Sequence, residues 1–362
     1  MGAGTRLPTL GAELPGELRC AHTRVPMSAL TCNMVGHSAF GDASVLSVMP
    51  LTLSAPAAGQ IRMTVKAVSI NPIDYKRREG KLKLIEGPQV MPLGICHDAA
   101  GVVESVGEGV TEFKVGDRVA TRKRGVGTYA EATLTGADVS AKIPDSVSFA
   151  HAAALPLAGM TALQALRAAD LKAGETVFIS GGAGGVGHYA VQLAKHYFKA
   201  GKVVATCSGS KAALCKSLGA DEVVDYTAVP HGTQYAGRGK FDVVMDTVGD
   251  SAAMCVLGKP HRKVVSVVNL DLPMAPNATF VVRAFLMAMG APVHFAAWRA
   301  GTTYQFVRLT PNAADLAFLL GLLDNKTIVS TLDTTFHGLA ACQDAFNKAE
   351  HGRPAGKVVI EI

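Results

Sequence analysis

Residues 176–199 read TVFISGGAGGVGHYAVQLAKHYFK, and this stretch decides the fold. A β-branched apolar run leads into a glycine cluster, and the cluster opens an amphipathic helical stretch. One glycine permits the tight turn, one lets the backbone approach a pyrophosphate, and one lets helix and strand pack closely. The helix N-terminus then offers free N–H groups and a positive dipole end to phosphates, so the stretch predicts a dinucleotide-binding turn. Gly182, Gly184 and Gly187 have the G-x-G-x-x-G spacing of such a turn. We expect these three glycines, with Gly185 and Val186 between them, to bind the dinucleotide.

The sequence after this turn favours NADPH over NADH. The next apolar run, Val203 to Cys207, is the expected second strand of the unit. An NAD site places Asp or Glu about 20 residues past the glycines to hold the ribose 2′-hydroxyl. This chain instead has Ser208, Ser210 and Lys211 there, and a hydroxyl and an ammonium attract a 2′-phosphate. Alternatively, Ser210 caps the next helix and Lys211 is solvated.

Length and composition indicate a large globular protein. With 362 residues and 49% hydrophobic residues, the chain has room for two domains. The net charge of +6 is mild, and the basic residues are scattered, which argues against a nucleic-acid partner. The seven cysteines are widely spread without a C-x-x-C, so we expect reduced thiols and a cytoplasmic location, with a mitochondrial one as the alternative.

Two segments bear on membranes and targeting. The most apolar run, Val281 to Trp298, is interrupted by charged and helix-breaking residues, so we expect a buried helix pair or a lid and no membrane span. Residues 1–26 are compositionally separate, lack a secretory core, and make a poor mitochondrial presequence. We expect a disordered extension over residues 1–26, and Met27 could equally be the start of the chain.

The order of elements predicts two domains. From residue 27 to 150 short apolar runs alternate with Gly, Pro and Asp, which is typical of a β-rich domain. From residue 151 to 300 strands alternate with helices, which predicts a parallel, doubly wound α/β sheet. A helical stretch from His151 to Ala169 precedes it and is interrupted by Pro156. Residues 301–362 add two helices and two strands.

Eight motifs in order resemble one family, the medium-chain dehydrogenase/reductase superfamily in its zinc-free, zeta-crystallin-like quinone oxidoreductase branch. The resemblance implies a GroES-like β-barrel domain built from both chain ends, with a Rossmann domain inserted between them. The motifs are SINPIDYK (69–76), HDAAGVV (97–103), FKVGDRV (113–119), LPLAGMTA (155–162), the glycine turn, LGAD (218–221), DTVG (246–249) and GKVV (356–359).

The resemblance implies catalysis without zinc. The superfamily's alcohol dehydrogenases place a zinc-binding Cys where this chain has Asn71 and a zinc-binding His at the position of His97. Catalytic zinc needs three converging protein ligands, and Asn is a poor one, so we expect no metal and a packed or hydrogen-bonded His97. Hydrogen-bond donors must then stabilise the developing oxyanion, and the candidates are Asn71, Tyr75 and Lys76. Alternatively, Asn71 is a turn residue, and Asp74 and Lys76 form a structural ion pair.

Four further residues are expected beside the cofactor, two by the resemblance and two from their places at strand ends. Thr161 matches one facing the nicotinamide, although a Thr inside a helix often bonds its own backbone. Val248 and Val268, at successive strand ends, are expected beside the nicotinamide ribose. Tyr226 matches a position that reaches the adenosine phosphate, although it could simply pack at its strand end.

The function implied is hydride transfer from NADPH to a small quinone or α,β-unsaturated carbonyl, in a homodimer by family analogy. A 2-enoyl thioester reductase is the alternative within this class. A different class, an NADPH-binding scaffold or sensor with little turnover, would carry the same glycine turn.

Overall fold

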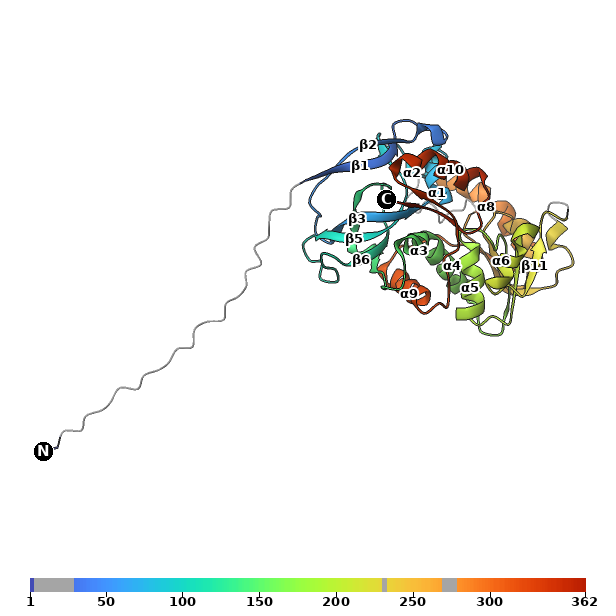
Figure 1. The fold of residues 1–362 in the computed structure, drawn as a ribbon. Helices are drawn as coiled ribbons and strands as arrows, with labels where there is room; N and C mark the ends of the chain where they lie inside the picture. The colour runs from blue at the N-terminus through green and yellow to red at the C-terminus, as the bar shows by residue number, and fades with distance from the viewer. Residues whose placement is uncertain (3–28, 230–232, 269–278) are drawn as a thin grey trace.

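The computed structural model describes residues 1–2, 29–229, 233–268 and 279–362, and its two halves are each organised around β-sheet (Figure 1). One half holds a six-stranded, fully parallel sheet in the order β11-β10-β9-β12-β13-β14. In chain order this is 3-2-1-4-5-6, the arrangement of a Rossmann domain, as the alternating pattern predicts. The strands are β9 (Thr176–Ile179), β10 (Lys202–Cys207), β11 (Glu222–Asp225), β12 (Phe241–Asp246), β13 (Gly258–Ser266) and β14 (Thr303–Phe306).

The GroES-like half is built from both ends of the chain, as the resemblance implies. Its C-terminal strand runs antiparallel to β3, with Val359 opposite Ser69. A seven-stranded sheet contains β3 (Gln60–Ser69), β5 (Asp98–Val106), β6 (Arg118–Arg122), β7 (Ala132–Gly136), β8 (Ser140–Lys142), β15 (Leu332–His337) and β16 (Lys357–Glu361). A three-stranded sheet contains β1 (Leu30–His37), β2 (Ser47–Leu53) and β4 (Leu93–Gly94).

Helices link the two sheets through a shared core cluster, and further clusters lie within each half. Pro156 divides the predicted helical stretch in two, because proline suits the first turn of a helix and not its interior. Alanines of both resulting helices are fully buried between the domains' strands. The helices are α1 (Pro72–Arg78), α2 (Lys83–Glu86), α3 (Phe149–Ala154), α4 (Pro156–Ala168), α5 (Gly187–Gln192), α6 (Ala212–Ser217), α7 (Ser251–Met254), α8 (Phe280–Ala300), α9 (Ala313–Asp324) and α10 (Cys342–His351).

The structure adds one strand to those predicted for the Rossmann sheet. The short strand β14 pairs with β13, so it belongs to the Rossmann sheet. We therefore propose that the return to the GroES-like domain follows residue 306 and not residue 300. The extension expected over residues 1–26 lies outside the described residues, apart from the first two. The six cysteines in the described part of the chain are free thiols.

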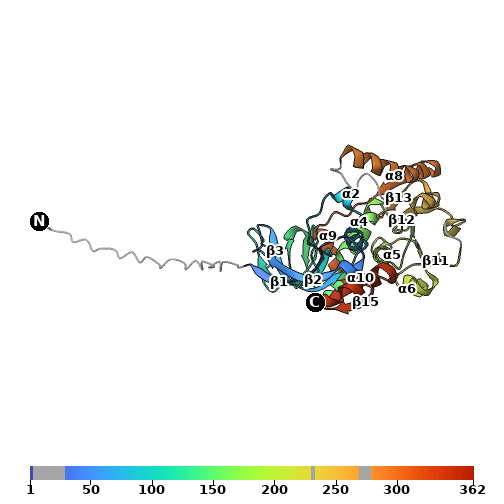
Figure 2. The ribbon, with the colours of Figure 1, turned by 90° about the horizontal axis from the view of Figure 1, so that it is seen from above.

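The prediction of a buried helix pair over Val281–Trp298 was wrong. The segment is part of one 21-residue helix, α8, with Pro292 inside it, since a single proline removes one backbone hydrogen bond without ending the helix. Figure 2 shows α8 along the periphery of the molecule. By length and composition alone it would also suffice to cross a membrane. Only one narrow face is buried, formed by Val282, Leu286, Gly290, Val293 and Ala297.

Candidate active site

The glycine turn lies at the carboxyl end of β9, where the strand order of the Rossmann sheet reverses. Two of its glycines are required by packing. A Cβ on Gly187 would lie 2.0 Å from the Gly181 carbonyl oxygen, and one on Gly182 would lie 2.7 Å from the Ala205 Cβ. Gly181 itself has a φ of +63°, which favours glycine.

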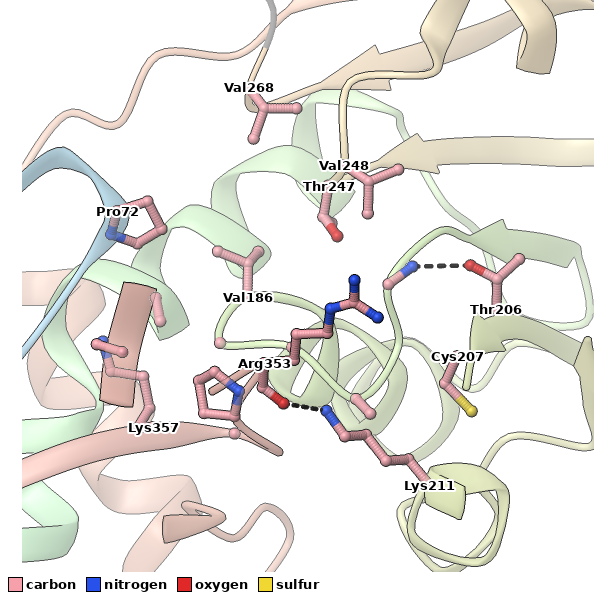
Figure 3. Close-up of a pocket in the computed structure, with 18 of the residues that line it drawn as sticks. Pro72, Val186, Thr206, Cys207, Lys211, Thr247, Val248, Val268, Arg353 and Lys357 are labelled. Atoms are coloured by element: carbon pink, nitrogen blue, oxygen red, sulfur yellow. Dashed lines mark hydrogen bonds between the residues drawn. The ribbon is translucent and has the colours of Figure 1, made fainter. Parts of the chain in front are cut away.

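A cavity of about 570 Å³ opens beside this turn and runs between the two domains. The sheet half contributes the turn and the ends of β10, β12 and β13. The GroES-like half contributes the start of α1 and the segment that leads into β16 (Figure 3). Three of the predicted turn residues, Gly184, Gly185 and Val186, line the cavity, whereas Gly182 and Gly187 lie behind it.

One end of the cavity is cationic and hydroxyl-rich. Ser208, Lys211 and Tyr226 line it, as the sequence predicts. Ser210 does not line it; its hydroxyl lies 3.3 Å from that of Ser208. The alternative that Ser210 caps the next helix is not seen either, because α6 begins at Ala212 with Lys211 at its N-cap.

Sequence reasoning missed Arg353 at this same end. Arg353 lines the cavity, and Figure 3 shows its guanidinium projecting into it. The Lys211 ammonium donates a hydrogen bond to the Arg353 carbonyl oxygen, which holds the lysine head beside the backbone of Arg353. No local pattern pointed to Arg353, because it lies 142 positions away in the chain.

Of the three residues predicted beside the nicotinamide and its ribose, two line the cavity and one does not. Val248 and Val268 line the cavity. Thr161 is buried and does not line it, because its hydroxyl donates to the Leu157 carbonyl oxygen 2.7 Å away within α4. Leu157 lines the cavity in its place. The backbone-bonding alternative for Thr161 is the one that the structure contains.

Asn71 lines the cavity as predicted and is the centre of a buried polar network. Its Nδ2 donates to Asp98 Oδ2 at 2.8 Å, and its Oδ1 accepts from the Lys357 ammonium at 2.5 Å. Burial raises the pKa of Asp98 to about 6 and lowers the pKa of Lys357, while each charge opposes the other's shift. The GKVV motif contains Lys357, but nothing in the sequence placed that lysine beside Asn71.

The two other candidate donors, Tyr75 and Lys76, point in different directions from α1. Tyr75 is half-buried and lines the cavity, and burial raises the pKa of its phenol. Lys76 is exposed and does not line the cavity, because one residue along a helix turns the side chain by about 100°. The alternative of an ion pair between Asp74 and Lys76 is not seen, because Asp74 forms a hydrogen bond with His97 instead.

His97 is held by hydrogen bonds at both ring nitrogens. Its Nδ1 contacts the Asp74 carboxylate, and its Nε2 contacts the Arg77 guanidinium. Burial lowers the pKa of His97, so the neutral ring donates at Nδ1 and accepts at Nε2. Within residues 29–229, 233–268 and 279–362, no group of three or more His, Cys, Asp or Glu is placed to hold a metal ion.

The residues of the cavity fit a phosphorylated dinucleotide. At its centre the backbone of Gly184 and Gly185 carries no side chain, so a pyrophosphate has access to the turn. At the far end Lys211 and Arg353 supply positive charge, and Ser208 and Tyr226 supply hydroxyls. At the near end Asn71 and Tyr75 supply donors. This donor set suits an anionic cofactor and a carbonyl acceptor.

Comparison with known proteins agrees with this geometry. Residues 57–145 match the alcohol dehydrogenase GroES-like domain, and residues 218–360 match the zinc-binding dehydrogenase family. A chloroplast envelope quinone oxidoreductase homolog of Arabidopsis thaliana is 32% identical, over 92% of this chain and 98% of its own. An NADPH-dependent alkenal/one oxidoreductase of the same plant, a chloroplastic protein, is 37% identical over 62% of this chain and 58% of its own.

A solved structure shows the same arrangement. The Escherichia coli quinone oxidoreductase, determined in complex with NADPH, superimposes with a TM-score of 0.75 at 26% identity. The match covers 91% of this chain and all of that one.

These relatives correct one expectation. Both Arabidopsis proteins are named as chloroplast proteins, which contradicts the predicted cytoplasmic location. A mitochondrial NAD(P)H oxidoreductase of Danio rerio, 30% identical over 84% of each chain, is also similar. Free thiols therefore indicated a reducing environment without identifying the compartment.

The relatives, the matched families and the superposed structure all agree with the motifs and with the two-domain fold. The chain belongs to the medium-chain dehydrogenase/reductase superfamily, in its zinc-free quinone oxidoreductase branch.

Proposed function

We propose that this protein is an NADPH-dependent, metal-free oxidoreductase that reduces a quinone or an α,β-unsaturated carbonyl. The observation that carries the proposal is a single cavity that joins the glycine turn and its cationic end to the donors around Asn71. The names of the relatives, quinone oxidoreductase and alkenal/one oxidoreductase, support this substrate class.

The cofactor is assigned to the residues of the cavity. Gly184, Gly185 and Val186 would hold the pyrophosphate, and Val248 and Val268 would flank the nicotinamide ribose. Around the 2′-phosphate we place Ser208, Lys211, Tyr226 and Arg353. NADPH, when bound, supplies the hydride.

The chain's own groups stabilise the reduced acceptor. Asn71 donates one Nδ2 hydrogen to Asp98 and retains a second, which is able to bind a carbonyl oxygen as it becomes an anion. The Tyr75 phenol is protonated at neutral pH, as an ordinary phenol is, and burial raises its pKa further, so it is available as a proton donor. The apolar walls contributed by Ile70, Leu157 and Val186 limit access of water to this end.

Turnover by EDTA-treated protein tests the proposal. We expect oxidation of NADPH with 1,4-benzoquinone, 9,10-phenanthrenequinone or an alkyl enone, at rates that chelation does not change. Turnover with NADH should be at least about tenfold lower in kcat/KM, because a neutral 2′-hydroxyl forms weaker bonds with Lys211 and Arg353 than a phosphate does.

The acceptor panel separates the alternatives. Preference for crotonyl-CoA would assign the 2-enoyl thioester reductase. Tight NADPH binding without turnover on any acceptor would assign a nucleotide-binding scaffold. Activity that is lost on chelation and restored by zinc would contradict the metal-free mechanism.

We further propose that the protein is a homodimer joined through β14 and α8. The proposal is supported by two neighbouring features. In the described part of the sheet β14 is an edge strand, and an open edge invites pairing with another strand. The adjacent helix α8 exposes Phe295 and Trp298, with 61% and 75% of their surfaces accessible. Exposed apolar patches of this kind mark interaction surfaces.

Size-exclusion chromatography with light scattering tests the dimer. We expect a dimer for the natural chain and a monomer for the Phe295→Ser/Trp298→Ser variant, because both substitutions remove apolar contact area. Val90→Ser, which changes an exposed apolar residue elsewhere, serves as the control and should remain dimeric. A monomeric natural chain that floats with anionic lipid vesicles would assign this face to a membrane surface instead.

A further inference from the structure

Lys357 is a buried charge at the junction of the two domains. It is the first residue of β16, and only 3% of its surface is accessible. Its ammonium donates to the Ile70 carbonyl oxygen at 2.8 Å and to Asn71 Oδ1 at 2.5 Å. Just before it, the Gly356 N–H donates to the Ala183 carbonyl oxygen at 2.8 Å, which ties this strand to the glycine turn.

Lys357 lies between the proposed cofactor site and the proposed acceptor site. A Cβ on Gly185 would lie 3.4 Å from the Lys357 Cδ, so the lysine's stem packs against the turn. Its head reaches Asn71, which lines the same cavity. The same side chain therefore contacts the cofactor side and the acceptor side.

The ammonium determines which way the Asn71 amide points. With Oδ1 bound to Lys357, Nδ2 must face the Asp98 carboxylate, which also accepts the Leu157 N–H at 3.2 Å and the Ser69 hydroxyl at 3.3 Å. The flipped amide would place its NH₂ against the ammonium and its oxygen against the carboxylate, and both contacts would be repulsive. Among the described residues no acceptor takes the second Nδ2 hydrogen, which leaves it for a ligand.

A purely structural role accounts poorly for this arrangement. Burying an ammonium and a carboxylate carries a large desolvation penalty, and well-packed apolar residues at such positions are often at least as stable. Paired charges at a cavity wall whose pKa values are shifted by burial are typical of functional sites.

We propose that Lys357 is a positioning residue of the reaction: it holds the Asn71 amide with its free N–H toward the acceptor. The inference rests on the proposed reductase function and adds the residue through which Asn71 acts.

Lys357→Met tests the inference, since Met has a similar length and no charge. We expect kcat with the preferred quinone or enone to fall about 100-fold, with the Kd for NADPH within about threefold of the natural value. Lys123→Met is the matched control. Lys123 is half-buried, and its ammonium donates to the Thr133 hydroxyl at 3.1 Å, away from this cavity, so kcat should be unchanged. Thermal melting shows whether both variants retain the fold. If Lys357→Met does not, Lys357→Gln, which keeps a hydrogen-bond donor, is used in its place.

A double-mutant cycle with Asn71→Ala distinguishes positioning from a general loss of packing. If Lys357 acts through Asn71, the double variant should have the kcat of Asn71→Ala alone, within about twofold. Full multiplication of the two single losses, or a kcat of Lys357→Met within about threefold of the natural enzyme, would overturn the inference. Absence of turnover in the natural protein on every acceptor would instead count against the proposed function, so the two failures are distinguishable.

Discussion

The variant Ser208→Asp/Lys211→Ala should lose affinity for NADPH by about two to three orders of magnitude, while its affinity for NADH changes by less than about threefold. The reason is electrostatic. The natural residues place a hydroxyl and an ammonium at the cationic end of the cavity, and the variant places a carboxylate there. A carboxylate repels a 2′-phosphate and accepts a hydrogen bond from a 2′-hydroxyl. Fluorescence titration with both cofactors measures the change directly.

A matched double variant exists at the other end of the neighbouring helix, α6. Ser217→Asp/Lys216→Ala makes the same chemical change at two exposed positions that do not line the cavity. Its affinities for both cofactors should equal those of the natural protein. An equal loss of NADPH and NADH affinity in the first variant would mean that these residues support the turn and do not read the 2′-phosphate. Arg353→Ala should lower the affinity for NADPH alone by about tenfold, because it removes one charge–phosphate contact.

The variant Asn71→Ala should lower kcat by about 100-fold or more and leave the Kd for NADPH within about threefold of its natural value. The amide contributes the one donor hydrogen in its network that no described residue accepts. Its removal therefore affects the charge that develops on the acceptor and not the pyrophosphate site. Stopped-flow measurement of nicotinamide oxidation at saturating NADPH separates the chemical step from binding.

The fold should survive this substitution. Asp98 retains the Leu157 N–H and the Ser69 hydroxyl, and Lys357 retains the Ile70 carbonyl, so neither charge is left without a partner. Asn33→Ala, which removes an exposed amide bound to Glu131, is the control and should keep full activity. A loss of NADPH affinity that parallels the loss of kcat would indicate that Asn71 maintains the cavity's shape and is not a donor to the acceptor.

Local patterns predicted the Rossmann half well because its signals are local. A β-branched run, a glycine turn and an amphipathic helix each follow from neighbouring residues, and β12 has the bounds expected for it, Phe241–Asp246. The short strand β14 was missed because its four residues form an edge strand with alternating exposure, which gives little apolar signal. Helix α8 was misjudged because apolar composition reports neither whether a segment is buried nor what covers it.

The sequence predicted those residues of the site that lie close together along the chain, and it missed those that come from distant segments. Asn71 and Tyr75 lie one helical turn apart, so their shared face is implied by the chain, and the same geometry turns Lys76 to solvent. Thr161 shows the limit of a resemblance to family positions, because its hydroxyl donates to the Leu157 carbonyl oxygen within α4 and does not reach the cavity. Arg353 and Lys357 come from the far end of the chain and had no local signal.

By itself the sequence determined the class of fold, the dinucleotide turn and the absence of an acidic residue after the second strand of the Rossmann unit. These properties depend on residue spacing, backbone freedom and charge within short stretches. Only the tertiary structure decided which charges surround the two ends of the cavity, because β16 pairs with β3 and carries Lys357 to Asn71 across 286 positions of chain. Contacts between such distant segments are set by how whole sheets pack, and no local pattern encodes them.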